Sequence, residues 1–77
     1  MNEMEALGAI DPKEFGRRLK ALRLKLDLTL IEMGEPAGVS GDTIRELENG
    51  DRPRPHERTL YRLIKAYPKL GATHGES

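Results

Sequence analysis

Residues that cap or break helices divide this chain into short helical segments. Asp11 followed by Pro12 is typical of a helix start, because aspartate accepts hydrogen bonds from free amides and proline suits the first helical position. Thr29 and Glu32 have the spacing of a capping box, which predicts a second helix. Pro36 interrupts this helix, because proline lacks an amide hydrogen and its ring clashes with the carbonyl group four residues earlier. The second helix is therefore short.

Two more helices are expected after a tight turn over residues 37–39. Ser40 caps the third, which ends at Gly50, because glycine tolerates the left-handed conformation of a helix end. The fourth ends before Pro68. Apolar residues at helical spacing mark the buried stripes, Phe15, Leu19, Leu22 and Leu26 in the first helix and Leu60, Leu63, Ile64 and Tyr67 in the fourth. With no strand pattern, we expect an all-α bundle of four to five helices.

Composition limits how this bundle is held together. The chain has 77 residues and no cysteine, so disulfides and thiolate metal sites are excluded and hydrophobic packing alone must stabilise one small domain. We assign residues 1–10 to an N-terminal extension with a possible short helix, 11–70 to the helical domain and 71–77 to a disordered tail. No apolar run approaches the roughly 20 residues of a membrane span. Residues 1–10 are acidic, which is wrong for a secretory signal, so we expect a cytoplasmic protein.

The charge is unevenly distributed along the chain. The formal net charge is zero, with thirteen basic and thirteen acidic residues, which argues against a simple polycation that wraps nucleic acid. Three of the acidic residues, Glu3, Glu5 and Glu76, lie outside residues 11–69. The helical domain therefore has a modest excess of positive charge, which is compatible with weak or dimer-dependent binding to DNA.

Two short helices joined by a tight glycine turn are typical of a helix-turn-helix. A wider pattern runs from Phe15 to Tyr67 and comprises Arg17, Leu19, Leu22, Arg23, Leu28, Thr29, Glu32, Met33, Ala37, Gly38, Val39, Ser40, Thr43, Ile44, Leu47, Glu48, Asn49, Gly50, Arg52, Pro55, Thr59 and Leu60. In these residues the sequence resembles the helix-turn-helix domains of the Cro and phage-repressor type, the XRE family. The resemblance implies a bundle like that of the lambda repressor, with helix 40–49 in the DNA major groove.

The resemblance assigns base reading to Gly41, Asp42, Arg45 and Glu46. Helix geometry independently places Asp42, Arg45, Glu46 and Asn49 opposite the apolar side, at about 100° per residue. Arginine can bridge O6 and N7 of guanine, and a carboxylate can accept a hydrogen bond from the cytosine amino group. Carboxylates also repel phosphates, so this acidic face departs from the family pattern. Arg45 has the alternative of pairing with Asp42 on the surface.

Phosphate contacts are expected from residues at helix starts, at the end of the third helix and in the loop after it, namely Thr29, Ser40, Thr43, Asn49, Arg52 and Arg54. The resemblance implies a structural ion pair between Arg23 and Glu48. Leu30 stands where the family usually has a phosphate-binding glutamine, and Gly34 suggests that another backbone passes close to the second helix.

Pro68 and the polar tail leave no room for the usual fifth helix. Residues 4–10 or a second subunit could cover that edge of the core. The candidates for a dimer interface are Leu24, Tyr67, Leu70 and residues 4–10.

The leading hypothesis is a small sequence-specific transcriptional regulator that binds double-stranded DNA as a homodimer, because one short helix reads too few base pairs alone. The alternative is a protein-interaction module on the same scaffold, whose acidic helix 40–49 binds a basic surface of another protein, with weak or no DNA binding. We do not expect an enzyme, a metal or a cofactor, because His56 and His74 have no partners at catalytic or ligand spacing.

Overall fold

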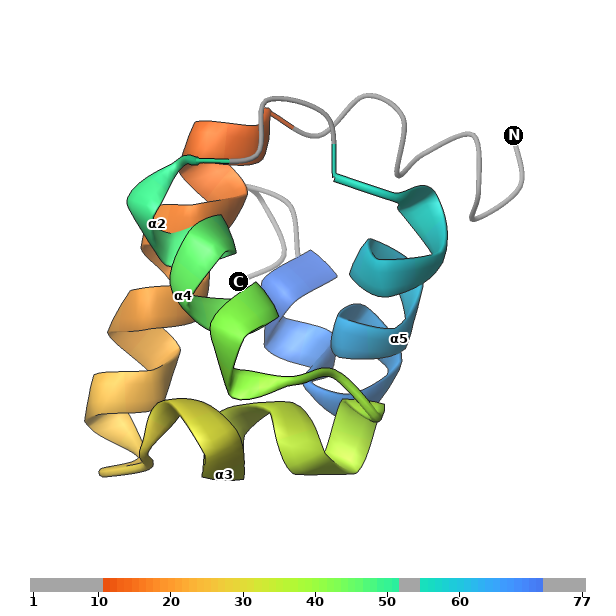
Figure 1. The fold of residues 1–77 in the computed structure, drawn as a ribbon. Coiled ribbons are helices and arrows are strands. Elements are labelled where there is room, and N and C mark those ends of the chain that lie inside the picture. Colours follow the sequence, from red (N-terminus) through yellow and green to blue (C-terminus); the bar gives the residue numbers. More distant parts are fainter. Residues whose placement is uncertain (1–10, 52–54, 72–77) are drawn as a thin grey trace.

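The computed structural model describes residues 11–51 and 55–71, and all regular elements in these ranges are helical. The elements are α2 (Pro12–Lys25), α3 (Leu30–Gly34), the 3₁₀ helix η1 (Glu35–Ala37), α4 (Gly41–Asn49), α5 (Glu57–Ala66) and the 3₁₀ helix η2 (Pro68–Gly71). In Figure 1, α2 runs down the left, α3 crosses the bottom, α5 lies on the right and α4 overlaps the upper part of α2. The predicted all-α helix-turn-helix architecture is confirmed.

The helix boundaries follow the capping chemistry of the sequence. The Thr29 hydroxyl accepts a hydrogen bond from the Glu32 amide at 3.1 Å, and the Glu32 carboxylate accepts one from the Thr29 amide at 2.8 Å, which completes the predicted capping box. The Ser40 hydroxyl likewise accepts a hydrogen bond from the Thr43 amide at 3.1 Å. Gly38 and Gly50 have φ angles of 69° and 73°, so each ends its helix in the left-handed region that favours glycine.

One aliphatic core holds these helices together. Its buried residues are Phe15, Leu19, Met33, Ala37, Ile44, Leu47, Leu60, Leu63 and Leu70. The core draws on α2, α3, η1, α4, α5 and η2, so every element contributes at least one buried side chain. No single helix is stable without the others, because helices this short depend on tertiary packing.

Two glycines let backbones approach more closely than other residues would allow. A Cβ atom on Gly16 would collide with the Leu47 carbonyl oxygen of α4, and one on Gly34 would collide with the Val39 carbonyl oxygen. The expectation that a backbone passes close to Gly34 is therefore confirmed. The two contacts set the distance of α4 from α2 and of α3 from the turn that follows it.

Two predicted positions of leucines are wrong. Helical spacing predicts Leu26 in the buried stripe of the first helix, but α2 ends at Lys25 and Leu26 is 46% exposed. The sequence also makes Leu70 a candidate for a dimer interface, but η2 turns it into the core, where it is 2% exposed. Because Gly71 is the last residue of η2, the helical region also extends one residue into the predicted tail. The expected short helix over residues 4–10 lies outside the described residues.

Tyr67 connects the end of α5 to α3. Its hydroxyl donates a hydrogen bond to the Met33 carbonyl oxygen at 2.7 Å, across 34 residues of sequence. Burial raises the pKa of the Tyr67 phenol above its ordinary value of about 10. The neutral phenol is therefore the form that the fold favours.

Replacing Gly16 by alanine should destabilise the protein by about 1–3 kcal/mol, because the added methyl group meets a backbone carbonyl that no side-chain rotation can move. Alanine is intrinsically the better helix residue, so the loss must come from this contact. Thermal unfolding would measure it, with Lys20→Ala at an exposed site of α2 as the control. Equal or higher stability of Gly16→Ala would contradict the close approach.

The raised pKa of Tyr67 predicts an alkaline loss of stability. The free energy of unfolding that the buried neutral Tyr67 phenol contributes is complete below pH 10, the pKa of an unfolded tyrosine. This contribution decreases as the pH rises through the higher pKa of the folded state. Urea unfolding of the wild type and of Tyr67→Phe at several pH values would test this. The variant should be less stable at neutral pH, and the difference between the two proteins should shrink above pH 10. A difference that does not change with pH would refute the assignment.

Candidate nucleic-acid interface

Helix α4 has one buried and one exposed side. Ile44 and Leu47 lie in the core, at 0% and 3% exposure, while the side chains of Asp42, Arg45 and Asn49 are exposed. Glu46 is half-buried. Three of the four side chains predicted to point outward therefore lie on an open surface, and α4 presents them on the side away from its packing partners.

The beginnings of α3 and α4 border a shallow groove of about 460 Å³. It is lined by Thr29, Leu30, Ile31, Ser40, Gly41 and Asp42. Sequence reasoning missed Ile31, whose side chain is 66% exposed. Helical periodicity could have predicted the exposure of Ile31, because positions 30, 33, 34 and 37 form the inward side of this segment and position 31 does not lie on that side.

Gly41 is in contact with Ile31 across this groove. A Cβ atom on Gly41 would lie 3.0 Å from the Ile31 Cγ1 atom, a tight contact. Gly41 has no side chain with which to read a base, so only its backbone can take part in the base contacts expected at this position. The exposed Ile31 side chain lies beside it and makes this part of the surface apolar.

Arg45 and Asp42 of α4 interact only weakly with each other. The Arg45 Nη2 atom lies 3.8 Å from the Asp42 Oδ1 atom, and the two side chains are 50% and 89% exposed. An ion pair this long and this exposed contributes little, because water screens it. Arg45 can therefore exchange this contact for one with a ligand at small cost.

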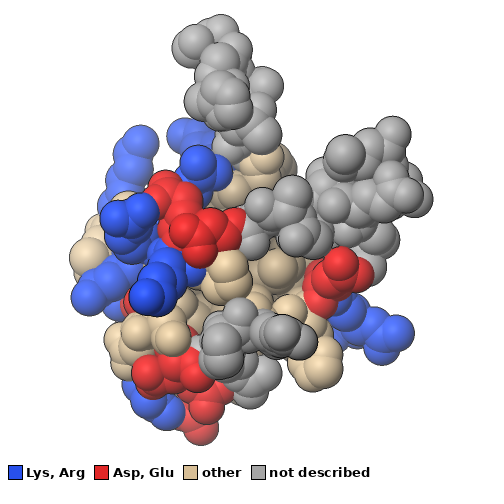
Figure 2. Space-filling view, turned by 90° about the horizontal axis from the view of Figure 1, so that it is seen from above, with Lys and Arg blue, Asp and Glu red and all other residues tan. Residues whose placement is uncertain are grey.

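The described residues predicted to contact DNA phosphates lie at several different positions around α3 and α4. The Ser40 hydroxyl donates a hydrogen bond to the Thr43 hydroxyl at 2.9 Å, so both groups lie together at the start of α4. The Thr29 hydroxyl is engaged in its own helix cap. Arg52 and Arg54 lie outside the described residues. Figure 2 shows Lys and Arg side chains gathered on the left, the side on which α2 lies in Figure 1.

The end of α4 is fixed by a partly buried ion pair. Arg23 of α2 donates through Nε to the Glu48 Oε2 atom at 2.7 Å and through Nη2 to Oε1 at 3.1 Å. Its Nη1 atom donates to the Leu28 carbonyl oxygen at 3.0 Å. The two side chains are only 15% and 4% exposed. The hydrogen bonds to Glu48 raise the pKa of Arg23, so the guanidinium stays charged.

This arrangement, two short helices around a glycine turn with the second held outward, defines a helix-turn-helix protein. The sequence profile of the helix-turn-helix domain family matches residues 14–72. The chain therefore belongs to the helix-turn-helix domain family. It is also similar to the HTH-type transcriptional repressor RghR of Bacillus subtilis (strain 168), with 37% identity over 54 residues. The match covers 70% of this chain and 40% of that relative, so the chain spans less than half of the repressor's length. No solved structure matches the chain.

In the part of the chain that the structure describes, no helix has both the length and the apolar character to cross a membrane. The same residues contain no group of three or more His, Cys, Asp or Glu side chains that could hold a metal ion.

Replacing Glu48 by alanine should destabilise the protein by about 3 kcal/mol, because it leaves the poorly exposed Arg23 guanidinium without its carboxylate partner. Urea unfolding would measure the loss. The matched control is Glu14→Ala, which removes a surface carboxylate that pairs with Arg17 and Arg18 and should change stability little. Similar effects of the two variants would show that the Arg23–Glu48 pair does not hold α4 in place.

Proposed function

We propose that this chain is a sequence-specific DNA-binding transcriptional regulator that inserts α4 into the major groove. The observation that carries the proposal is the orientation of α4, whose Ile44 and Leu47 face the core while Asp42, Arg45 and Asn49 face solvent. An α-helix presented in this way fits the major groove, where each base pair shows its own pattern of donors and acceptors. The name of the Bacillus relative, a transcriptional repressor, supports the same function.

Arg45 is the proposed main base-reading residue. It is exposed, its pairing with Asp42 is weak, and its guanidinium suits the O6 and N7 acceptors of guanine. Asp42 and Glu46 are proposed to accept hydrogen bonds from cytosine amino groups. Gly41, whose missing side chain makes room for Ile31 of α3, is proposed to contact the base edges through its backbone alone.

Phosphate contacts are proposed for the residues around the ends of α4. Ser40 and Thr43 lie at its beginning, where free amides and the helix dipole favour an anion. Asn49 lies at its end and is exposed. Thr29 is proposed to contact phosphate from the start of α3, and Arg52 and Arg54 are proposed to do so from the loop after α4.

We further propose that the protein acts in the cytoplasm as a homodimer, without catalytic activity or a cofactor. A helix of nine residues reads only a few base pairs, so two copies are needed for selective binding. The alternative, a protein-interaction module that uses the acidic side of α4, is not favoured by the family assignment or by the name of the relative.

The DNA-binding proposal can be tested by selecting duplexes from a random pool and measuring binding to the selected site by fluorescence anisotropy at two salt concentrations. Arg45→Ala should weaken binding to the selected site by about 1–3 kcal/mol and reduce discrimination at one base pair. Asp42→Lys with Glu46→Lys should increase binding to unrelated DNA and steepen its salt dependence. The stoichiometry should be two chains per site.

The matched control is Lys65→Ala, which removes an exposed cation from α5, away from α4. It should leave site discrimination unchanged. If the wild type selects no sequence and binds DNA only after the two lysines are introduced, the DNA-binding proposal is wrong and the protein-interaction alternative gains support.

A further inference from the structure

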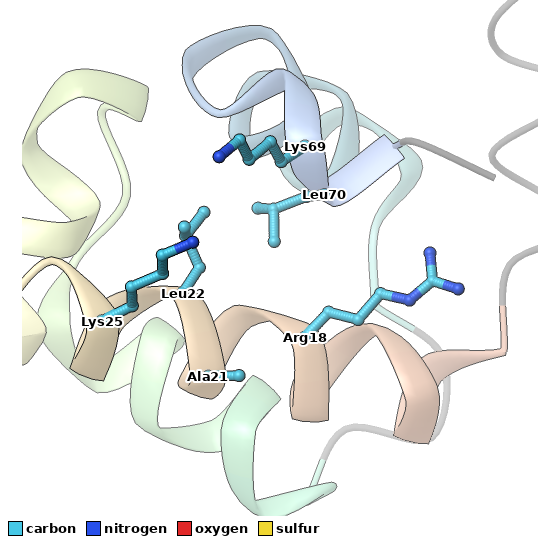
Figure 3. A pocket seen from close by; sticks show the side chains of 6 residues that line it. All are labelled: Arg18, Ala21, Leu22, Lys25, Lys69 and Leu70. Atoms are coloured by element: carbon cyan, nitrogen blue, oxygen red, sulfur yellow. The ribbon is translucent and has the colours of Figure 1, made fainter. Parts of the chain in front are cut away.

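A second groove lies between α2 and η2, outside the proposed DNA-binding surface. It is lined by Arg18, Ala21, Leu22, Lys25, Lys69 and Leu70, and we name it the α2–η2 groove (Figure 3). Its volume of about 250 Å³ is below the range of roughly 300–1,000 Å³ that small-molecule pockets occupy. The α2–η2 groove is therefore better suited to side chains of a peptide segment than to a small ligand.

The groove combines an apolar floor with a basic rim. In Figure 3, Leu22 of α2 and Leu70 of η2 point toward each other, and the long side chains of Lys25 and Lys69 border the space between them. Both lysines are exposed, and the structure gives neither an ion pair with another described residue. A matching ligand would therefore be apolar on one side and acidic beside it.

We propose that the α2–η2 groove binds the chain's own N-terminal segment, residues 1–10. Met4 and Leu7 are large apolar residues that an extended segment would carry back along α2 toward Leu22, whereas Ile10 directly precedes Asp11. Glu3 and Glu5 would lie near the basic rim. The segment contains no Lys or Arg, so its side-chain charge is complementary to that of the rim.

The segment is long enough to reach the groove. Leu22 lies eleven residues beyond Asp11, about 16 Å along α2 at roughly 1.5 Å per residue. Met4 precedes Asp11 by seven residues, which span up to about 23 Å when extended. Covalent attachment also gives the segment an effective concentration of about millimolar, so individually weak contacts suffice for binding.

Two other occupants fit the groove less well. A second copy docked through the same groove would bring two sets of basic rims together, because a two-fold interface pairs each patch with itself. The C-terminal residues 72–77 contain no large apolar side chain to place over the half-buried Leu22. The N-terminal segment fits better, because it supplies apolar residues for the floor of the groove and acidic residues for its basic rim.

The absence of cysteine permits a specific test on the full chain. Asn2→Cys would carry a single nitroxide spin label, and the loss of amide NMR signal intensity near the label would be measured. We expect signals of residues 18–25 and 68–71 to be weakened, and those of Asp42, Arg45 and Glu46 in α4 to be retained. Unchanged signals in the groove, or equal losses on all sides of the molecule, would overturn the proposal.

Charge variants test the role of the rim. Lys25→Glu with Lys69→Glu should restore the groove signals, and adding Glu3→Lys with Glu5→Lys should weaken them again. Lys20→Glu with Lys65→Glu changes the net charge equally at other exposed sites and should leave the loss unchanged. The NMR spectra also show whether each variant is folded.

A mixed sample separates the chain's own segment from that of a second copy. Isotope-labelled chains without the nitroxide are mixed with unlabelled chains that carry it. Full signal intensity in this sample supports binding within one chain, whereas a loss confined to the groove would assign the segment to a neighbouring copy and overturn the proposal.

Discussion

The ion pair between Arg23 and Glu48 is the contact on which the exposed position of α4 depends. Arg23 uses three nitrogen atoms at once, two for the Glu48 carboxylate and one for the Leu28 carbonyl oxygen. It thereby joins α2, the segment before α3 and the end of α4. Because the two side chains are 15% and 4% exposed, neither charge is well solvated without the other. The ion pair therefore fixes the position of α4, the helix that carries the proposed base-reading side chains.

Close backbone packing also helps to fix the position of α4. Gly16 brings α2 against the backbone of α4, and Gly34 brings α3 against the turn at Val39. The chain has few large side chains with which to fill wide spaces, since it contains one Phe, two Tyr and no Trp. Short distances between helices are thus the means by which a small aliphatic core becomes dense. They also leave α4 with only one buried side, so the other remains available to a ligand.

Several features were predictable because they depend on neighbours in the sequence. The capping box at Thr29, the cap at Ser40 and the left-handed turn at Gly38 involve residues no more than three positions apart. The exposure of Leu26 and the burial of Leu70 were not predictable in this way. Leu26 follows the last turn of α2, and Leu70 is carried into the core by η2 after Pro68. Both outcomes depend on where the chain travels after a helix ends.

The same distinction between contacts local in the sequence and contacts set by helix packing applies to the candidate site. The sequence by itself determined where α2, α3 and α4 begin, the family resemblance and the acidic outward side of α4, because caps, breakers and periodicity act within a few residues. Only the tertiary structure decided that Ile31 lies against Gly41, that Arg45 reaches Asp42 only at 3.8 Å, and that Leu22 and Leu70 form the floor of one groove. These contacts join side chains whose separation depends on how the helices pack, and periodicity along one helix carries no information about that distance.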